Sequence, residues 1–270
     1  MKKMLSVVIV LIGVFAWTAS YARYNPDNDI EAYEPRYAAF LKKNPGMEGR
    51  DVLIMVNLGL DQPNYQHAVE VAWPERVDVF VSKHYALPQG YKPKNLVKVD
   101  RNYAQSGVTL REDCYNALLS MAKDMEKEGL QLYIKAGYRL NKKRGSANSL
   151  WYAWPGHSEH QTGLAFDLRK KNVTYKTLGE YDYEKTREYA WLMQRAYRYG
   201  FILSYPKGKS ELTGFGFEPW HWRYIGVEIA TDMKEKGFVT YHEYWATYLI
   251  RDALAIEKPT FYPRRVGRSL

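Results

Sequence analysis

With 270 residues, 46% of them hydrophobic and 26% charged, the chain is ordinary for a globular protein and long enough to bury a sizeable core without disulfide bonds. Its single cysteine, Cys114, excludes an internal disulfide and a four-cysteine zinc site. The formal net charge of +9 favours polyanionic partners, either nucleic acid or an anionic polymer outside the cell.

Residues 1–22 have the pattern of a secretory signal peptide. Lys2 and Lys3 form a positive region, an apolar run follows at 5–17, and small residues stand where a signal peptidase reads the chain. We expect cleavage, because the apolar run is short, and export to the cell envelope or extracellular space. Anionic cell-wall polymers then suit the basic surface better than nucleic acid. The alternative is an uncleaved membrane anchor, since the uncharged span 4–22 is long enough to cross a bilayer.

Downstream of a polar linker and N-terminal segment at 23–49, helical and strand patterns follow one another without an internal repeat. The clearest pattern predicts a helix over 110–128, where apolar residues recur at helical spacing before Gly129. The other expected elements are helices at 37–43, 184–199, 226–236 and 240–255, and strands at 52–56, 77–82, 130–136, 201–205 and 217–224. This order predicts a single α+β domain over 50–257, followed by a basic tail at 258–270.

Two stretches supply the groups that a metal site needs. The first, S-E-H-Q-T-G-L-A-F-D, contains His160 and Asp167, and the second, E-P-W-H, contains Glu218 and His221. Zinc catalysis requires about three protein ligands, an open fourth position and a nearby base, and these residues meet that count. We therefore expect His160, Asp167 and His221 to bind zinc. Glu218 is the candidate general base.

On one straight strand, His160 and Asp167 would point to opposite faces, because an odd number of positions separates them. A helix is disfavoured by Gly163 and by the strand-favouring Phe166. We expect a turn at 162–163 between two short strands, which would let both side chains converge.

Two further candidates lie close to these motifs. Arg139 closes the strand predicted at 130–136, where a fixed guanidinium can stabilise an oxyanion or bind a carboxylate. Ser158, just before the first ligand, is in a position to contact the substrate or to orient a ligand.

Other peptidase chemistries fit the sequence poorly. Segments at 120–123 and 204–207 match S-x-x-K, but the K-T-G that a penicillin-binding serine peptidase requires is absent, since K-T at 176–177 is followed by leucine. The H-E at 242–243 is not completed to H-E-x-x-H, which excludes the zinc peptidases that carry that motif.

The two stretches resemble the signatures of the VanY-type D-alanyl-D-alanine carboxypeptidases, zinc metallopeptidases with S-x-H-x-x-G-x-A-x-D and E-x-x-H motifs. The fixed positions are filled by Ser158, His160, Gly163, Ala165 and Asp167, and by Glu218 and His221. The G-Y-R at 137–139 and the P-K-G-K at 206–209 also resemble stretches of that family, and the similarity extends over about residues 50–244.

The resemblance implies a small antiparallel sheet flanked by helices and a zinc ion held by the two histidines and the aspartate. It also implies that Glu218 activates the zinc-bound water and that Arg139 polarises the scissile carbonyl. The implied reaction removes the C-terminal D-alanine from peptidoglycan stem peptides, which makes the chain a D,D-carboxypeptidase. An L,D-carboxypeptidase acting on tetrapeptide stems would use the same residues. A non-catalytic cell-wall-binding protein is a second alternative, against which the intact Glu218 argues.

Three positions depart from the family pattern near the expected substrate site. Leu140 stands where the family has serine, Arg144 where glutamine is common, and Ser204 where many relatives have arginine. The candidate substrate-binding residues are Tyr138, Arg139, Arg144 and Ser158. Arg144 would replace a lost polar contact to a terminal carboxylate, so we expect the loop at 140–154 to influence substrate choice.

Overall fold

The computed structural model describes residues 30–140, 145–171 and 180–254. The signal-peptide pattern at 1–22, the candidate Arg144 and the basic tail at 258–270 lie outside the described residues. The chain divides into two compact units, of which one spans Gln62–Tyr244 and the other combines the chain up to Asp61 with the chain from Trp245 onward. Within the described ranges, no helix is long and apolar enough to span a bilayer.

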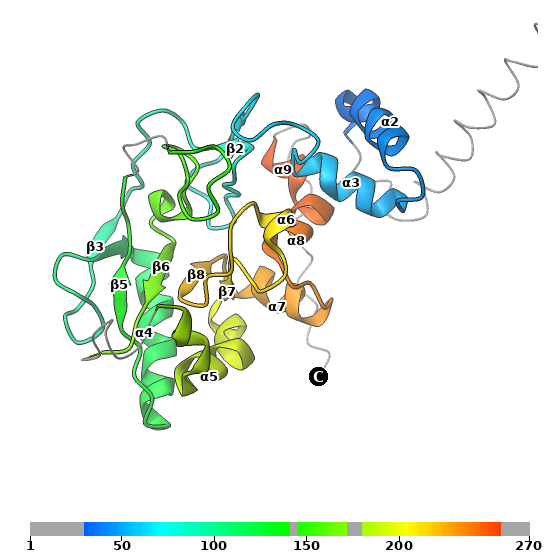
Figure 1. The fold of residues 1–270 in the computed structure, drawn as a ribbon. Helices are drawn as coiled ribbons and strands as arrows, with labels where there is room; N and C mark the ends of the chain where they lie inside the picture. The colour runs from blue at the N-terminus through cyan, green and yellow to red at the C-terminus, as the bar shows by residue number, and fades with distance from the viewer. Residues whose placement is uncertain (1–29, 141–144, 172–179, 255–270) are drawn as a thin grey trace, which may run out of the picture. The chain divides into compact units, whose positions relative to one another are not determined.

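The smaller unit is helical. Its elements are η1 (Glu31–Tyr33), α2 (Glu34–Lys43), α3 (Gly49–Asn57) and α9 (Ile250–Ala253), drawn in blue and red in Figure 1. The Tyr37 hydroxyl donates a hydrogen bond to Asn57 Oδ1 at 2.6 Å, and Asn57 Nδ2 donates to the Ala246 carbonyl at 3.0 Å. These bonds join the N-terminal helices to the C-terminal part of the same unit.

The strand predicted at 52–56 is wrong, because these residues form α3. A run of β-branched apolar residues favours a strand locally. Here Val52, Leu53 and Val56 are buried together with Tyr37 of α2 in one hydrophobic cluster. Packing of one helical face against a neighbour outweighs the local preference. The helix predicted at 37–43 is confirmed, and it begins earlier, at Glu34.

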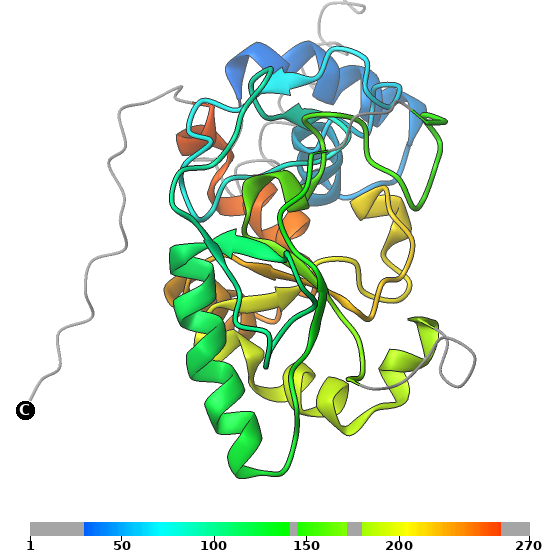
Figure 2. The same ribbon diagram turned by 90° about the vertical axis from the view of Figure 1, so that its left-hand side faces the viewer.

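The larger unit is built around a four-stranded antiparallel sheet with the strand order β5-β6-β8-β7. The strands are β5 (Ile134–Ala136), β6 (Ala165–Leu168), β8 (His221–Tyr224) and β7 (Phe201–Leu203). Helices α4 (Glu112–Lys127), α5 (Arg187–Arg195) and α7 (Val227–Glu235) lie beside the sheet, as the two views in Figures 1 and 2 show. The predicted fold class, α+β with a small antiparallel sheet flanked by helices, is confirmed.

Short elements complete this unit. Two ladders pair β1 (Val69–Glu70) in parallel with β2 (Tyr85–Ala86), and β3 (Leu96–Lys98) antiparallel with β4 (Thr109–Arg111). The 3-10 helices are η2 (Glu159–Thr162), η3 (Glu180–Lys185) and η4 (Ala196–Tyr199), and a short α-helix is α6 (Ser210–Thr213). Helix α8 (Tyr241–Tyr248) begins in this unit, whose last residue is Tyr244.

The register of the central strands separates a polar face from an apolar one. Asp167 pairs with His221, and Phe166 pairs with Trp222. Successive side chains of a strand point to opposite faces, so Asp167 and His221 share one face and the two aromatic residues share the other. The Trp222 ring lies 6.4 Å from the ring of Tyr189 on α5, measured between centroids. The apolar face is therefore packed by helix, and the polar face carries the candidate ligands.

Several predicted elements are shorter than expected. The strand at 217–224 begins only at His221, so Glu218 lies in the turn before β8. The helix at 184–199 is α5 followed by η4, and the helix at 240–255 is divided into α8 and α9.

The strand predicted at 77–82 does not form, although Val79, Phe80 and Val81 are buried. The guanidinium of Arg223 donates hydrogen bonds to the carbonyls of Val77 at 3.1 Å and Val79 at 2.9 Å. These backbone acceptors are therefore satisfied by a side chain instead of by a neighbouring strand.

Candidate metal centre and active site

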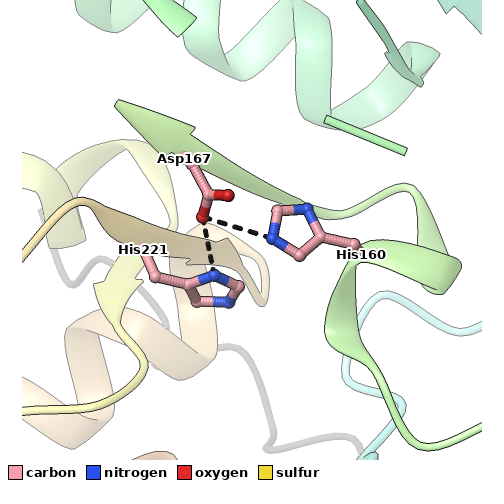
Figure 3. Close-up of side chains that lie close together, drawn as sticks. All are labelled: His160, Asp167 and His221. Atoms are coloured by element: carbon pink, nitrogen blue, oxygen red, sulfur yellow. Dashed lines mark hydrogen bonds and ion pairs between the residues drawn. The ribbon is translucent and has the colours of Figure 1, made fainter. Parts of the chain in front are cut away.

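The three expected ligands come together in one buried cluster. Asp167 on β6 and His221 on β8 face each other across the strand pair, and His160 reaches them from η2. Their ligand atoms all lie within 4.8 Å of one another. Asp167 Oδ1 is 3.0 Å from His221 Nδ1 and 3.2 Å from His160 Nε2, and Figure 3 shows both rings directed at this carboxylate.

A tight turn between His160 and β6 brings these side chains together. The structure places His160 in a 3-10 helix, not on the first of two short strands as predicted, and the turn follows at Gly163. Gly163 has a φ of 72°, in the left-handed region that glycine adopts without strain. A Cβ at this position would lie 3.1 Å from Arg111 Cγ and 3.1 Å from Leu96 Cδ2. Backbone conformation and space thus both favour glycine here.

Hydrogen bonds on the outer side of each imidazole determine which ring nitrogen faces the cluster. His160 Nδ1 lies 2.8 Å from the Gly137 carbonyl, and His221 Nε2 lies 2.9 Å from Glu159 Oε2. Both partners are acceptors, so these outer nitrogens carry hydrogens. The inner nitrogens, His160 Nε2 and His221 Nδ1, are then the ones available to a metal.

The donor set fits a zinc ion. His160 Nε2 is buried and has no hydrogen-bond partner among the described residues, although it lies beside Asp167. Burial works to raise the pKa of Asp167, but the neighbouring imidazoles of His160 and His221 outweigh it and hold that pKa well below its usual value. Burial lowers the pKa of His160 more than Asp167 raises it. An ionised carboxylate and two imidazoles are ligands that zinc accepts.

Glu218 lies beside the cluster without belonging to it. Its Oε2 is 3.7 Å from His221 Nδ1, and its side chain is 12% exposed. Burial raises the pKa of Glu218 to about 7, although the charge of His221 acts in the opposite direction. A carboxyl group with a pKa near neutrality suits a general base that accepts a proton and returns it.

Arg139 places a guanidinium at the edge of the cluster. Its Nη1 lies 3.7 Å from Asp167 Oδ2, and its side chain is 52% exposed. Its backbone N–H contacts the His160 carbonyl at 3.4 Å, which links the end of β5 to the ligand helix η2. The exposed guanidinium can therefore meet a substrate that approaches the ligands from solvent.

The remaining described residues near the expected substrate site differ in exposure. Ser158 is buried just before η2, and the Tyr138 hydroxyl is buried with no hydrogen-bond partner among the described residues. Leu140 is exposed. Ser204, expected near substrate recognition because it departs from the family pattern, is 1% exposed and donates a hydrogen bond to Glu159.

Sequence reasoning assigned no role to Glu159. Its position is variable in the S-x-H motif, so the pattern itself attaches no chemistry to it. The structure buries its carboxylate against His221, and hydrogen bonds and nearby charge hold the pKa of Glu159 at about 2 against the opposing effect of burial. The sequence feature that could have indicated a role for Glu159 is its place immediately before the predicted ligand His160.

Zinc binding should tighten as the pH rises. Burial works to lower the pKa of His221, but hydrogen bonds to Asp167 and Glu159 raise it to about 10 before a metal binds. The proton must therefore leave His221 when zinc binds, so the apparent affinity should increase about tenfold per pH unit near neutral pH. Calorimetry in two buffers of different ionisation enthalpy should detect about one proton released per zinc ion. Binding without proton release would contradict the raised pKa.

Comparisons with known proteins agree with this geometry. A family model described as VanY D-alanyl-D-alanine carboxypeptidase matches residues 107–227. The putative carboxypeptidase YodJ of Bacillus subtilis is 30% identical over 84% of this chain and 81% of that protein. A D-alanyl-D-alanine carboxypeptidase of Enterococcus faecium is 34% identical over 60% of this chain, a match that covers 49% of the relative.

Solved structures show the same fold. The LdcB LD-carboxypeptidase superposes with a TM-score of 0.58 and 32% identity, over 67% of this chain and 91% of that structure. VanYB in complex with D-alanine-D-alanine gives a TM-score of 0.51 and 27% identity, over 64% of this chain and 98% of that structure. A VanY mutant from a VanB-type resistance cassette, solved in complex with Zn(II), gives a TM-score of 0.51 and 27% identity, over 62% of this chain and 98% of that structure.

Fold, ligand cluster and relatives together define a zinc metallocarboxypeptidase. The chain belongs to the VanY-type D-alanyl-D-alanine carboxypeptidase family. The family and the zinc cofactor predicted from the sequence are thus both confirmed.

Proposed function

We propose that this protein is an exported D,D-carboxypeptidase that removes the C-terminal D-alanine from peptidoglycan stem peptides. The observation that carries the proposal is the carboxyl group of Glu218, whose side chain is only 12% exposed and which lies 3.7 Å from a ring nitrogen of the expected ligand His221. A site that only binds a metal or a cell-wall peptide has no use for a base in this position. The solved VanYB complex with D-alanine-D-alanine supports this substrate class.

His160, Asp167 and His221 would hold the zinc ion. When bound there, zinc supplies a Lewis acid that polarises a carbonyl and lowers the pKa of water. The three side chains are almost completely enclosed, and the outer hydrogen bonds of both imidazoles keep their inner nitrogens directed at one point. The protein therefore presents a preorganised ligand set.

Glu218 performs the proton transfers of the reaction. Its carboxylate accepts a proton from the attacking water, whose oxygen forms the new bond to the last peptide carbonyl carbon. The same proton is then delivered to the nitrogen of the leaving D-alanine as the C–N bond breaks. A pKa of about 7 allows both the acceptance and the return of the proton near neutral pH.

Arg139 binds the developing negative charge. Its guanidinium is half-exposed, and its contact with Asp167 at 3.7 Å is too long for a strong ion pair. It is consequently available to donate hydrogen bonds to the scissile carbonyl oxygen or to the terminal carboxylate of the substrate.

An L,D-carboxypeptidase acting on tetrapeptide stems is the second candidate. The likeness to the LdcB LD-carboxypeptidase, with 32% identity and a TM-score of 0.58, favours it. Both reactions hydrolyse the bond to a C-terminal D-alanine, so the ligands and the base would serve either one. The difference lies in the residue that precedes the scissile bond.

Export would bring the site to these substrates. The proposal that the chain acts in the cell envelope or outside the cell rests on the signal-peptide pattern of residues 1–22. An uncleaved anchor would keep the same active site at the outer surface of the membrane.

The two activities can be separated with purified stem peptides. We expect mass spectrometry to show loss of one alanine from the pentapeptide and none from the tetrapeptide. A chelator should abolish the loss, and added zinc should restore it. Release from the tetrapeptide alone would establish the L,D reaction instead. Release that persists in the chelator would contradict a metal mechanism.

A further inference from the structure

A buried polar network lies on the outer side of His221, away from the nitrogen that faces the other ligands. Its central member is Glu159, whose side chain is 4% exposed. Glu159 Oε2 accepts a hydrogen bond from Ser204 Oγ at 2.6 Å and lies 2.9 Å from His221 Nε2. Arg223 Nη1 is 3.8 Å from the other carboxylate oxygen, Oε1.

The network joins three elements of the fold. Glu159 begins η2, Ser204 directly follows β7, and His221 begins β8. Ser204 is 1% exposed and Arg223 is fully buried, so water does not compete for these contacts. An ionised carboxylate in such surroundings is destabilising unless it is hydrogen-bonded and paired. Ser204, His221 and Arg223 supply that compensation.

The direction of the hydrogen bonds has a consequence for the metal. A carboxylate only accepts, so His221 Nε2 carries a hydrogen and Nδ1 is left to bind zinc. Both hydrogen bonds reach the same oxygen, Oε2, whose two lone pairs accept them together, so the bond from Ser204 fixes the rotation in which the carboxylate meets His221. The Tyr205 ring, stacked on His221 at 4.9 Å between centroids, limits rotation of the imidazole from another side.

We propose that Glu159 and Ser204 are positioning residues of the zinc centre. Ser204 orients the carboxylate of Glu159, and Glu159 holds His221 in the tautomer whose Nδ1 faces the metal. The proposal rests on the zinc-dependent activity proposed above, but it concerns metal binding and not substrate choice. Neither residue is expected to contact the substrate, because both are buried behind the ligand.

The test is the zinc affinity of the full chain, measured by competition with a chromophoric chelator. Glu159→Gln retains the volume of the side chain and removes its charge. Removal of a residue that hydrogen-bonds to a metal ligand typically lowers metal affinity about 10- to 100-fold. We expect Glu159→Gln to lose zinc affinity within that range. Ser204→Ala should give a smaller loss of zinc affinity. Ser204→Thr keeps the hydroxyl group and should bind zinc about as tightly as the unmodified protein.

A matched control separates positioning from general destabilisation. Thr240 is fully buried and donates a hydrogen bond from Oγ1 to Glu243 Oε2 at 2.7 Å, a hydroxyl–carboxylate contact like that of Ser204. Thr240→Val should retain the zinc affinity of the unmodified protein. The cobalt-substituted protein supplies a second readout, since the visible spectrum of Co(II) should change in Glu159→Gln and not in Thr240→Val.

Unchanged zinc affinity in folded Glu159→Gln, or an equal loss in Thr240→Val, would overturn the proposal. If Glu159→Gln does not fold, the comparison of Ser204→Ala with Ser204→Thr tests the proposal. Equal zinc affinities of these two variants would show that the hydroxyl group has no role and would overturn the proposal. A protein that binds zinc but releases no alanine would contradict the proposed function and leave this inference standing.

Discussion

Glu218→Ala should lose hydrolysis while retaining its zinc. General acid–base catalysis contributes about 10²- to 10⁴-fold to a rate, so we expect a loss in that range or larger. Glu218 lies 3.7 Å from His221 Nδ1 but outside the set of His160, Asp167 and His221 whose ligand atoms converge. Its removal therefore takes away the proton acceptor and leaves the metal ligands in place. The measurements are the rate of alanine release and the zinc content per chain.

The matched control for this variant is Glu235→Ala, which removes an exposed carboxylate at the end of α7. It should keep the rate of the unmodified protein. Full activity in Glu218→Ala would exclude the proposed mechanism. Loss of zinc from that variant would instead identify Glu218 as a ligand, and the base would have to be sought elsewhere.

Removal of either histidine ligand should release the metal. A catalytic zinc site uses about three protein ligands, and His160→Ala or His221→Ala would leave two. We expect the zinc content to decrease from about one ion per chain to a small fraction of that after dialysis, with activity lost in parallel. Elemental analysis of the purified variants measures the content directly.

The two histidine variants should differ in stability. Both variants take an imidazole away from Asp167. In addition, His221→Ala leaves the buried carboxylate of Glu159 without its imidazole partner, whereas His160→Ala frees the neutral carbonyl of Gly137. Loss of one partner from a buried ion pair is more destabilising than loss of one neutral hydrogen bond. We therefore expect the lower free energy of unfolding in His221→Ala.

His67 offers the control for this pair. It is exposed and has a φ of 53°, so His67→Asn is the suitable change because asparagine tolerates the left-handed conformation. This variant should bind as much zinc as the unmodified protein. Unchanged zinc content in His160→Ala or His221→Ala would remove that residue from the ligand set.

Local sequence patterns predicted the helices of this chain better than its strands. Residues 110–128 carry a helical repeat that ends at a glycine, and α4 forms there. Residues 52–56 and 77–82 both contain β-branched apolar residues, which favour strands locally. Residues 52–56 instead form part of α3 and pack in a helical cluster, and the carbonyls of Val77 and Val79 accept hydrogen bonds from Arg223. Both outcomes depend on neighbours that are distant in the chain, which a local pattern does not contain.

The chemistry of the centre could be read from residue types and spacing. Two histidines, an aspartate and a glutamate in the two motifs identify a nitrogen and oxygen donor set with a base, because the preference of zinc for these atoms depends on their chemical nature. Gly163 likewise indicated a turn between His160 and Asp167, because only glycine adopts that backbone conformation without strain.

The arrangement of these groups was decided by the packing of distant segments. Strand register sets Asp167 opposite His221, and burial raises the pKa of Glu218 to about 7. Ser204, which the family resemblance placed near the expected substrate site, is enclosed against Glu159, a residue that the motif leaves undefined. Register, burial and the direction of a hydrogen bond arise only when segments far apart in the chain come into contact, so these properties emerge with the tertiary structure.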